Sequence, residues 1–287
     1  MFLEDAVKAA AILEIALTSR NKNDEDPVPM CGVPFRSADH YIARLIENGC
    51  KVAVCEQMED ASLAKGLVRR EVVRVVTPGM ILNEELLDKS RHNFLLALAG
   101  TRDAAGIAYL DISTGTFKTL ELPARHAKIP PRLLDEAVKV DPKEILLPRN
   151  FEKDPSFKNL LNVFQGRQIT YLDNHCFHPE SARERLLHQF GTRSLEGFGL
   201  EGMKAAIAAA GAVLTYVRET QLRETSHIFQ IAAHDISRFL IIDDRSCKNL
   251  ELLANLQTQD RKGSLVHILD QTVTAMGSRL IRNWIRY

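Results

Sequence analysis

The fold of the central part of the chain is decided by three strand-like runs, Asn93-Phe-Leu-Leu-Ala-Leu-Ala99, Gly106-Ile-Ala-Tyr-Leu-Asp-Ile112 and Thr116-Phe-Lys-Thr-Leu120. Each run is short and free of proline, the first two are mostly apolar and the third combines β-branched and aromatic residues with polar ones, which is typical of strands in a sheet. Only Ser113-Thr-Gly115 separates the last two runs, and so short a connection favours a hairpin. The sequence therefore predicts three successive strands.

Beyond these runs, strand and helix patterns alternate. They predict a helix at 132–140, a strand at 144–147, helices at 154–163 and 181–188, and an alanine-rich helix at 203–218. A hairpin followed by alternating strands and helices is the order of a ribonuclease-H-like α/β sandwich. We therefore expect such a unit in the centre of the chain.

The first 78 residues have the pattern of a separate, mixed α/β unit. Helical spacing begins near Met1, and no helix breaker interrupts it between Asp5 and Leu13. The pattern then predicts a turn-rich segment at 21–34, a helix at 37–47, a buried strand at 51–55 and a β-branched strand at 70–77.

A domain boundary is predicted at Thr77-Pro-Gly79, because proline disfavours helix before it and glycine loosens the chain after it. We predict an α/β multidomain chain, and its parts are a mixed α/β domain at 1–78, a linker at 79–91, a ribonuclease-H-like α/β domain at 92–224 and the beginning of a mainly helical domain at 225–287. Neither end carries the usual cap or stop residues, so we expect both to be cuts in a longer sequence.

The charge of the chain gives no general argument for nucleic-acid binding. The formal net charge is zero, and residues 1–78 hold ten basic against twelve acidic side chains. Only the tail differs, because residues 261–287 hold five Lys or Arg against the single Asp270. A solvated helix face explains that modest basic excess as well as a binding surface does.

The five cysteines are scattered and form no Cys-x-x-Cys pair, which is typical of a protein in a reducing cytoplasm. The start of the chain lacks the pattern of a signal peptide. No apolar run approaches the roughly 20 residues that span a bilayer. We expect a cytoplasmic protein that does not enter a membrane.

Two motifs suggest small ligands. Gly197-Phe-Gly-Leu-Glu-Gly202 fits a dinucleotide-binding turn, but polar residues precede it and Met203 stands where a P-loop lysine would be needed. We favour a loop that ends at a helix start, with nucleotide binding as the less favoured reading. His175, Cys176 and His178 lack the second ligand pair that a closed zinc site needs.

Asp111 ends a predicted strand, where ribonuclease-H-like nucleases hold their first metal-binding carboxylate. Two-metal hydrolysis needs several converging carboxylates, and the next strand offers only Glu144, on a face that the sequence leaves ambiguous. A structural role for Asp111 in the following turn is preferred, and a metal-dependent nuclease is the alternative.

Cys55 lies in an apolar strand, where a buried thiol is usually inert.

Several strings follow one another in the order and spacing of a known family. They are Val28-Pro-Met-Cys-Gly-Val-Pro34, Val52-Ala-Val-Cys-Glu-Gln57, Arg69-Arg-Glu-Val-Val-Arg-Val-Val-Thr-Pro-Gly79, Leu110-Asp-Ile-Ser-Thr-Gly115 and Leu269-Asp-Gln-Thr-Val-Thr-Ala-Met-Gly-Ser-Arg279. On these strings the whole chain resembles the MutS family of DNA mismatch-repair proteins. The resemblance identifies the three predicted units as a mismatch-binding domain, a connector domain and the beginning of a core or lever domain.

The resemblance implies three partners: double-stranded DNA with mismatches or small loops, the protein MutL, and a second copy in the full-length homodimer. ATP and Mg²⁺ belong to the ATPase part of the full-length family. We therefore expect no cofactor and no enzyme activity in this chain.

The family inserts the Phe of a Phe-x-Glu motif beside the mispair. Phe2-Leu-Glu4 has that form, but the family motif ends immediately before the residue that matches Met1. We interpret Phe2 as a core residue of the first helix and expect the inserting Phe to be absent. The chain should then bind DNA weakly and with little preference for mismatches.

Four residues match the DNA surface of the family. Arg20 matches an arginine that contacts the backbone, where a guanidinium donates two parallel hydrogen bonds to phosphate. Met30 lies in a segment that follows the minor groove, and Gly32 would permit close approach there. Arg36 replaces a histidine of many relatives and is expected to contact phosphate. On the predicted helix at 181–188, the candidate surface for MutL comprises Arg183, Glu184 and Arg185.

Overall fold

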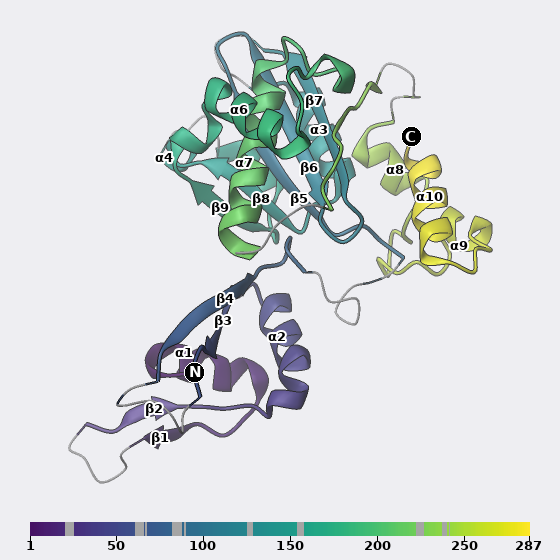
Figure 1. Cartoon of the computed structure of the whole chain (residues 1–287). Coiled ribbons are helices and arrows are strands. Elements are labelled where there is room, and N and C mark those ends of the chain that lie inside the picture. The colour runs from purple at the N-terminus through teal and green to yellow at the C-terminus, as the bar shows by residue number, and fades with distance from the viewer. Residues whose placement is uncertain are drawn as a thin grey trace.

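The computed structural model describes most of the chain: residues 1–20, 26–60, 66, 68–81, 88, 90–124, 129–153, 158–221, 227–236, 240 and 242–287, with only the backbone given for Arg20, residues 158–160 and Asp244. Figure 1 shows an N-terminal lobe, a central sheet covered by helices on both faces, and a small group of helices beside that sheet. The prediction of a mixed α/β multidomain chain is confirmed.

The N-terminal lobe holds two small antiparallel sheets, β1 with β2 and β3 with β4. Its elements are α1 (Leu3–Leu13), β1 (Thr18–Arg20), β2 (Val28–Met30), η1 (Phe35–Ser37), α2 (Ala38–Glu47), β3 (Val52–Gln57) and β4 (Arg70–Val76). Small residues let α1 pack closely, and its Ala6, Ala9 and Leu13 are buried with Leu45 of α2.

The prediction that 51–55 forms a buried strand is half wrong. The strand exists as β3, but only Val52 and Val54 are partly buried, and Cys55 is exposed. The reason is that β3 belongs to a two-stranded ribbon, and only one face of it lies on α2. An apolar run does not reveal whether a second layer covers the other face.

The central sheet has the strand order β10-β7-β6-β5-β8-β9. Its strands are β5 (Phe94–Gly100), β6 (Ala104–Asp111), β7 (Thr116–Pro123), β8 (Glu144–Pro148), β9 (Gln168–Leu172) and β10 (Ala232–Ala233). The predicted strand succession is confirmed: β5, β6 and β7 pair antiparallel, and β8, β9 and β10 join in parallel. The sequence analysis missed β9 and β10.

Helices cover both faces of this sheet, α6 and α7 on one and α3 on the other. The helices of this part are α3 (Pro131–Val140), α4 (Asn150–Lys153), α5 (Lys158–Val163), η4 (Asn174–Phe177), α6 (Pro179–Phe190), η5 (Glu196–Phe198) and α7 (Lys204–Gln221). Of the helix predicted at 154–163, the end is found as α5, and residues 154–157 lie outside the described residues.

The N-terminal end of α7 lies directly on the sheet at Gly106. A Cβ at that position would stand 2.5 Å from the backbone nitrogen of Ala206 and 2.6 Å from the carbonyl carbon of Ala205. On the neighbouring strand, Glu121 accepts hydrogen bonds from the same two amides, at 2.8 and 3.0 Å. The carboxylate satisfies donors that a helix start otherwise leaves unpaired.

The C-terminal helices are α8 (Asp244–Asn249), α9 (Leu265–Leu269) and α10 (Ala275–Arg286). Each begins at a polar cap whose side chain accepts a backbone hydrogen bond: Asp243, Ser264 and Thr274. Within the described residues, no helix has the length and apolar character needed to cross a membrane.

We expect Gly106→Ala to lower the free energy of unfolding by about 1–3 kcal/mol, because the added methyl group must displace the first turn of α7. Urea unfolding measures the change. Gly197→Ala is the control, because a Cβ at Gly197 meets nothing within 4 Å. Equal midpoints for the two variants would contradict the close approach of α7 to β6.

Candidate nucleic-acid interface

The first two residues extend the hairpin of β1 and β2. Strand β2 pairs antiparallel with β1, with Met30 opposite Thr18. On its other side, Phe2 forms an antiparallel bridge with Met30. The backbone amide of Cys31 donates to the carbonyl of Met1 at 3.1 Å, and the amino group of Met1 donates to the carbonyl of Cys31 at 3.0 Å. Met30 therefore lies at the centre of a three-stranded edge.

The interpretation of Phe2 as a core residue is wrong. Phe2 is 43% exposed, and its backbone is extended rather than helical, with φ −136° and ψ 161°. The extended bridge to Met30 sets the direction in which the chain enters α1, so the Phe2 side chain does not join the buried face of that helix. The local helical spacing gave no sign of this bridge.

The turn after β2 is open to solvent. Met30 is partly buried, and Gly32 is exposed with nothing within 4 Å of a Cβ built on it. Gly32 is also absent from the glycines with positive φ, so the fold itself does not require glycine there. The open space at Gly32 leaves room for the backbone of this turn to approach an external partner closely.

Two exposed residues follow this turn in η1. Arg36 is exposed, as expected of a phosphate contact, and Phe35 is 90% exposed. The sequence analysis missed Phe35, although an aromatic residue between Pro34 and Arg36 is a signal that could have found it. The backbone of Arg20 pairs with Val28 in the same hairpin, while its side chain lies outside what the structure describes.

The carboxylates of Asp111 and Glu144 lie on opposite faces of the central sheet. Asp111 pairs with Phe94 and Glu144 pairs with Leu95, and these neighbours on β5 alternate between the faces. Phe94 packs with the core under α3 and Leu95 with the core under α7. The two carboxylates therefore do not converge, and the described residues hold no group of three or more His, Cys, Asp or Glu arranged for a metal ion.

Asp111 is completely buried and serves the turn that follows it. Its carboxylate accepts hydrogen bonds from the Ser113 hydroxyl at 2.6 Å and the Ser113 amide at 3.0 Å, and it lies 2.7 Å from Nδ1 of His92. Burial alone would raise the pKa of Asp111, but these hydrogen bonds and the adjacent His92 ring hold the pKa below its usual value. This geometry gives the nuclease reading no support.

The glycine-rich turn at 197–202 lies beside a helix start whose amides are already used. Gly199 and Gly202 have positive φ and turn the chain into α7. The amides of Ala205 and Ala206, which would face a phosphate there, donate to Glu121 instead. The structure therefore favours the loop interpretation over the nucleotide site.

The three candidate partner residues on α6 differ in exposure. Glu184 is exposed, and Arg183 forms an ion pair with Glu201 at 3.5 Å. Arg185 points inward, where its Nη2 donates to the carbonyl of Cys176 at 2.6 Å. Burial lowers the pKa of Arg185. Only Arg183 and Glu184 are thus placed for an external contact.

Comparison with known proteins covers nearly the whole chain. Residues 1–85 match the family model MutS domain I, residues 93–229 match MutS domain II, and residues 245–287 match MutS domain III. Proteins named DNA mismatch repair protein MutS are 61% identical in Desulforapulum autotrophicum, 50% in Desulfosudis oleivorans and 47% in Desulfatibacillum aliphaticivorans, each over all 287 residues. The chain spans 32% of the length of each of these relatives.

Three consecutive domains of one family, in their order along the chain, define a multidomain protein of mixed α/β architecture. The chain belongs to the MutS family.

We expect Asp111→Asn to lower the free energy of unfolding by about 1–3 kcal/mol at pH 7, because a buried charged acceptor is lost. The folded-state pKa is lowered, so the wild-type advantage is present above about pH 4 and disappears as the pH falls through that folded pKa. Denaturant unfolding at pH 7 and pH 3 measures both effects. The exposed Asp103→Asn is the control, and equal stability of the two variants at pH 7 would contradict this role.

Proposed function

We propose that this chain contributes DNA recognition to mismatch repair, and that it contacts the duplex through the three-stranded edge and the turn that follows β2. The proposed contact residues are Phe2, Arg20, Met30, Gly32, Phe35 and Arg36. The observation that carries the proposal is the exposed pair Phe2 and Phe35 near the open turn at Gly32, where a Cβ would meet nothing within 4 Å. The relatives' printed name, DNA mismatch repair protein MutS, supports it.

The chemistry of this surface fits the minor groove. Apolar side chains and close backbone approach suit a narrow groove, whereas Arg20 and Arg36 would neutralise flanking phosphates. The N-terminal part has no excess of basic residues. Binding should therefore be weak and should fall only gently as the salt concentration rises, because few phosphate contacts release few counterions.

Gly32→Ala should weaken binding to duplex DNA at least about threefold while leaving unfolding unchanged, because the methyl group holds the chain off the groove but touches nothing in the protein. Fluorescence anisotropy with matched and mismatched duplexes at one low salt concentration measures the affinity. Gly197→Ala controls for removing a glycine elsewhere. Unchanged affinity of Gly32→Ala for both duplexes would contradict the proposed DNA-binding surface.

The same assay tests the role of Phe2. We expect less than about tenfold preference for the mismatched duplex, which corresponds to under about 1.4 kcal/mol. Phe2→Ala should weaken binding to both duplexes alike, because Phe2 is proposed as a surface contact and not as the inserting residue. A strong mismatch preference that disappears in Phe2→Ala would show instead that Phe2 inserts beside the mispair.

We also propose that the connector surface on α6 takes part in contact with MutL, in a full-length protein that forms homodimers and uses ATP and Mg²⁺ outside the present chain. Exposed Glu184 and partly exposed Arg183 support this placement. Glu184→Lys should weaken MutL binding about threefold, within the usual worth of an exposed ion pair. Surface plasmon resonance measures it, and exposed Glu152→Lys on α4 is the control. Equal MutL affinities of the two variants would show that Glu184 is not part of the contact.

A further inference from the structure

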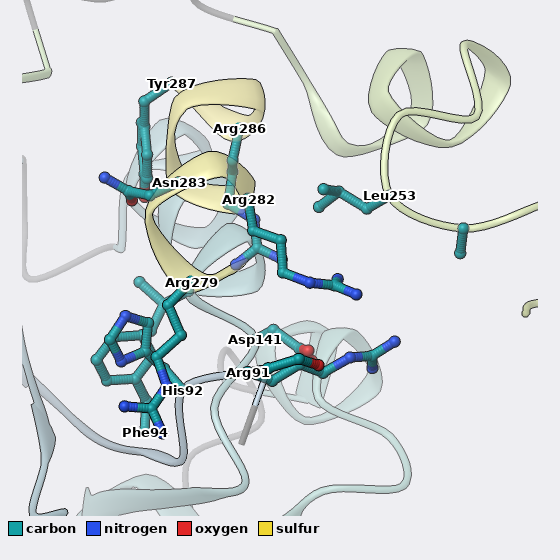
Figure 2. Close-up of a pocket in the computed structure, with 13 residues that line it drawn as sticks. Arg91, His92, Phe94, Asp141, Leu253, Arg279, Arg282, Asn283, Arg286 and Tyr287 are labelled. Atoms are coloured by element: carbon teal, nitrogen blue, oxygen red, sulfur yellow. The ribbon is translucent and has the colours of Figure 1, made fainter. Parts of the chain in front are cut away.

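Four arginines gather where α10 meets the central domain. Arg279, Arg282 and Arg286 are spaced three and four residues apart and so share one face of α10. They line a cavity of about 180 Å³ together with Arg91, which precedes β5, and with Asp141. Figure 2 shows Arg279 and Arg282 extending from α10 toward the wall that carries Arg91 and His92.

The acidic groups near this cavity are already paired. Asp141 forms an ion pair with Arg167, and Asp111 on the sheet is bound by His92. Asp88 lies 3.5 Å from Nε of Arg91. Among the residues that the structure describes, no carboxylate lies within ion-pair distance of the three arginines on α10. The cavity therefore carries an excess of positive charge.

The arginines also present buried donors that lack acceptors. The Nε atoms of Arg279 and Arg282 are buried and make no hydrogen bond within the described part of the chain. Burial and the proximity of Arg91, Arg261 and Arg286 lower the pKa of Arg282, and nearby Asp88 opposes them only in part. A buried donor without an acceptor and a group of like charges both raise the free energy of the folded chain. A bound anion would relieve both, because it accepts hydrogen bonds and neutralises positive charge.

We propose that this cavity binds a phosphate-class oxyanion that joins α10 to the central domain. Guanidinium groups donate paired, parallel hydrogen bonds that match the oxygens of a tetrahedral anion. The cavity is far larger than the roughly 10–15 Å³ that one water needs, so a four-oxygen anion fits. Because Arg91 and the α10 arginines come from different parts of the chain, the bound anion fixes one part on the other.

Thermal unfolding of the chain tests the site with inorganic phosphate as the probe. About 10 mM phosphate should raise Tm by roughly 2–4 °C over chloride of equal ionic strength, because an anion that binds only the folded state stabilises it. Acetate at equal ionic strength should give no such shift, which separates a phosphate site from one for carboxylates. A short DNA duplex, added in a separate arm, tests whether backbone phosphate is the preferred source.

The direction in which Arg282→Gln changes the unfolding temperature distinguishes an anion site from a purely structural role of Arg282. In chloride the variant should unfold at the wild-type temperature or above it, because it removes like-charge crowding, and in phosphate it should lose the shift. Arg193→Gln, at an exposed arginine outside this cavity, should keep the shift. The proposal is overturned if Arg282→Gln destabilises the chain in chloride, if the shift survives in it, if acetate acts like phosphate, or if neither phosphate nor the duplex gives a shift that Arg282→Gln removes.

Discussion

The buried carboxylate of Glu144 is the constraint on which the arrangement of the chain depends. It accepts hydrogen bonds from the Thr170 hydroxyl at 2.7 Å, from the Tyr216 hydroxyl at 2.7 Å and from the Thr77 hydroxyl, while the ammonium group of Lys51 lies 3.5 Å away. A completely buried charge is tolerated only when it is paired and hydrogen-bonded in this way. Because Lys51 and Thr77 come from the N-terminal lobe, the need to satisfy one carboxylate holds that lobe against the central sheet.

The two acidic groups that suggested a nuclease are therefore explained by structure. Glu144 organises the face of the sheet under α7, and Asp111 organises the turn at the end of β6. The two side chains lie on opposite faces of the sheet, because their partners on β5, Phe94 and Leu95, are consecutive residues of one strand. Two features are not explained by the packing of the fold: the open turn around Gly32 and the arginines of α10 that line the cavity.

Local patterns predicted the elements well, and tertiary contacts account for what they missed. The hairpin of β6 and β7 follows from two strand-like runs and a short turn, which are local signals. The exposed Phe2 depends on a bridge to Met30, nearly thirty residues away, which no helical spacing reports. The strand at 168–172 is short and only partly buried, so its pattern is weak. The sequence does not distinguish a solvated face from a binding surface for the α10 arginines, because only the fold places Arg91 beside them.

Helix α7 is pinned near both ends, by the Glu121 carboxylate at its first amides and by the Tyr216 hydroxyl on Glu144. Its 18 residues span about 27 Å at 1.5 Å per residue. Glu121 lies on β7 and Glu144 lies on β8, so this single helix ties strands from both sides of β5 and β6 together. Because Glu144 also contacts Lys51 and Thr77, the same helix shares its anchoring carboxylate with the N-terminal lobe.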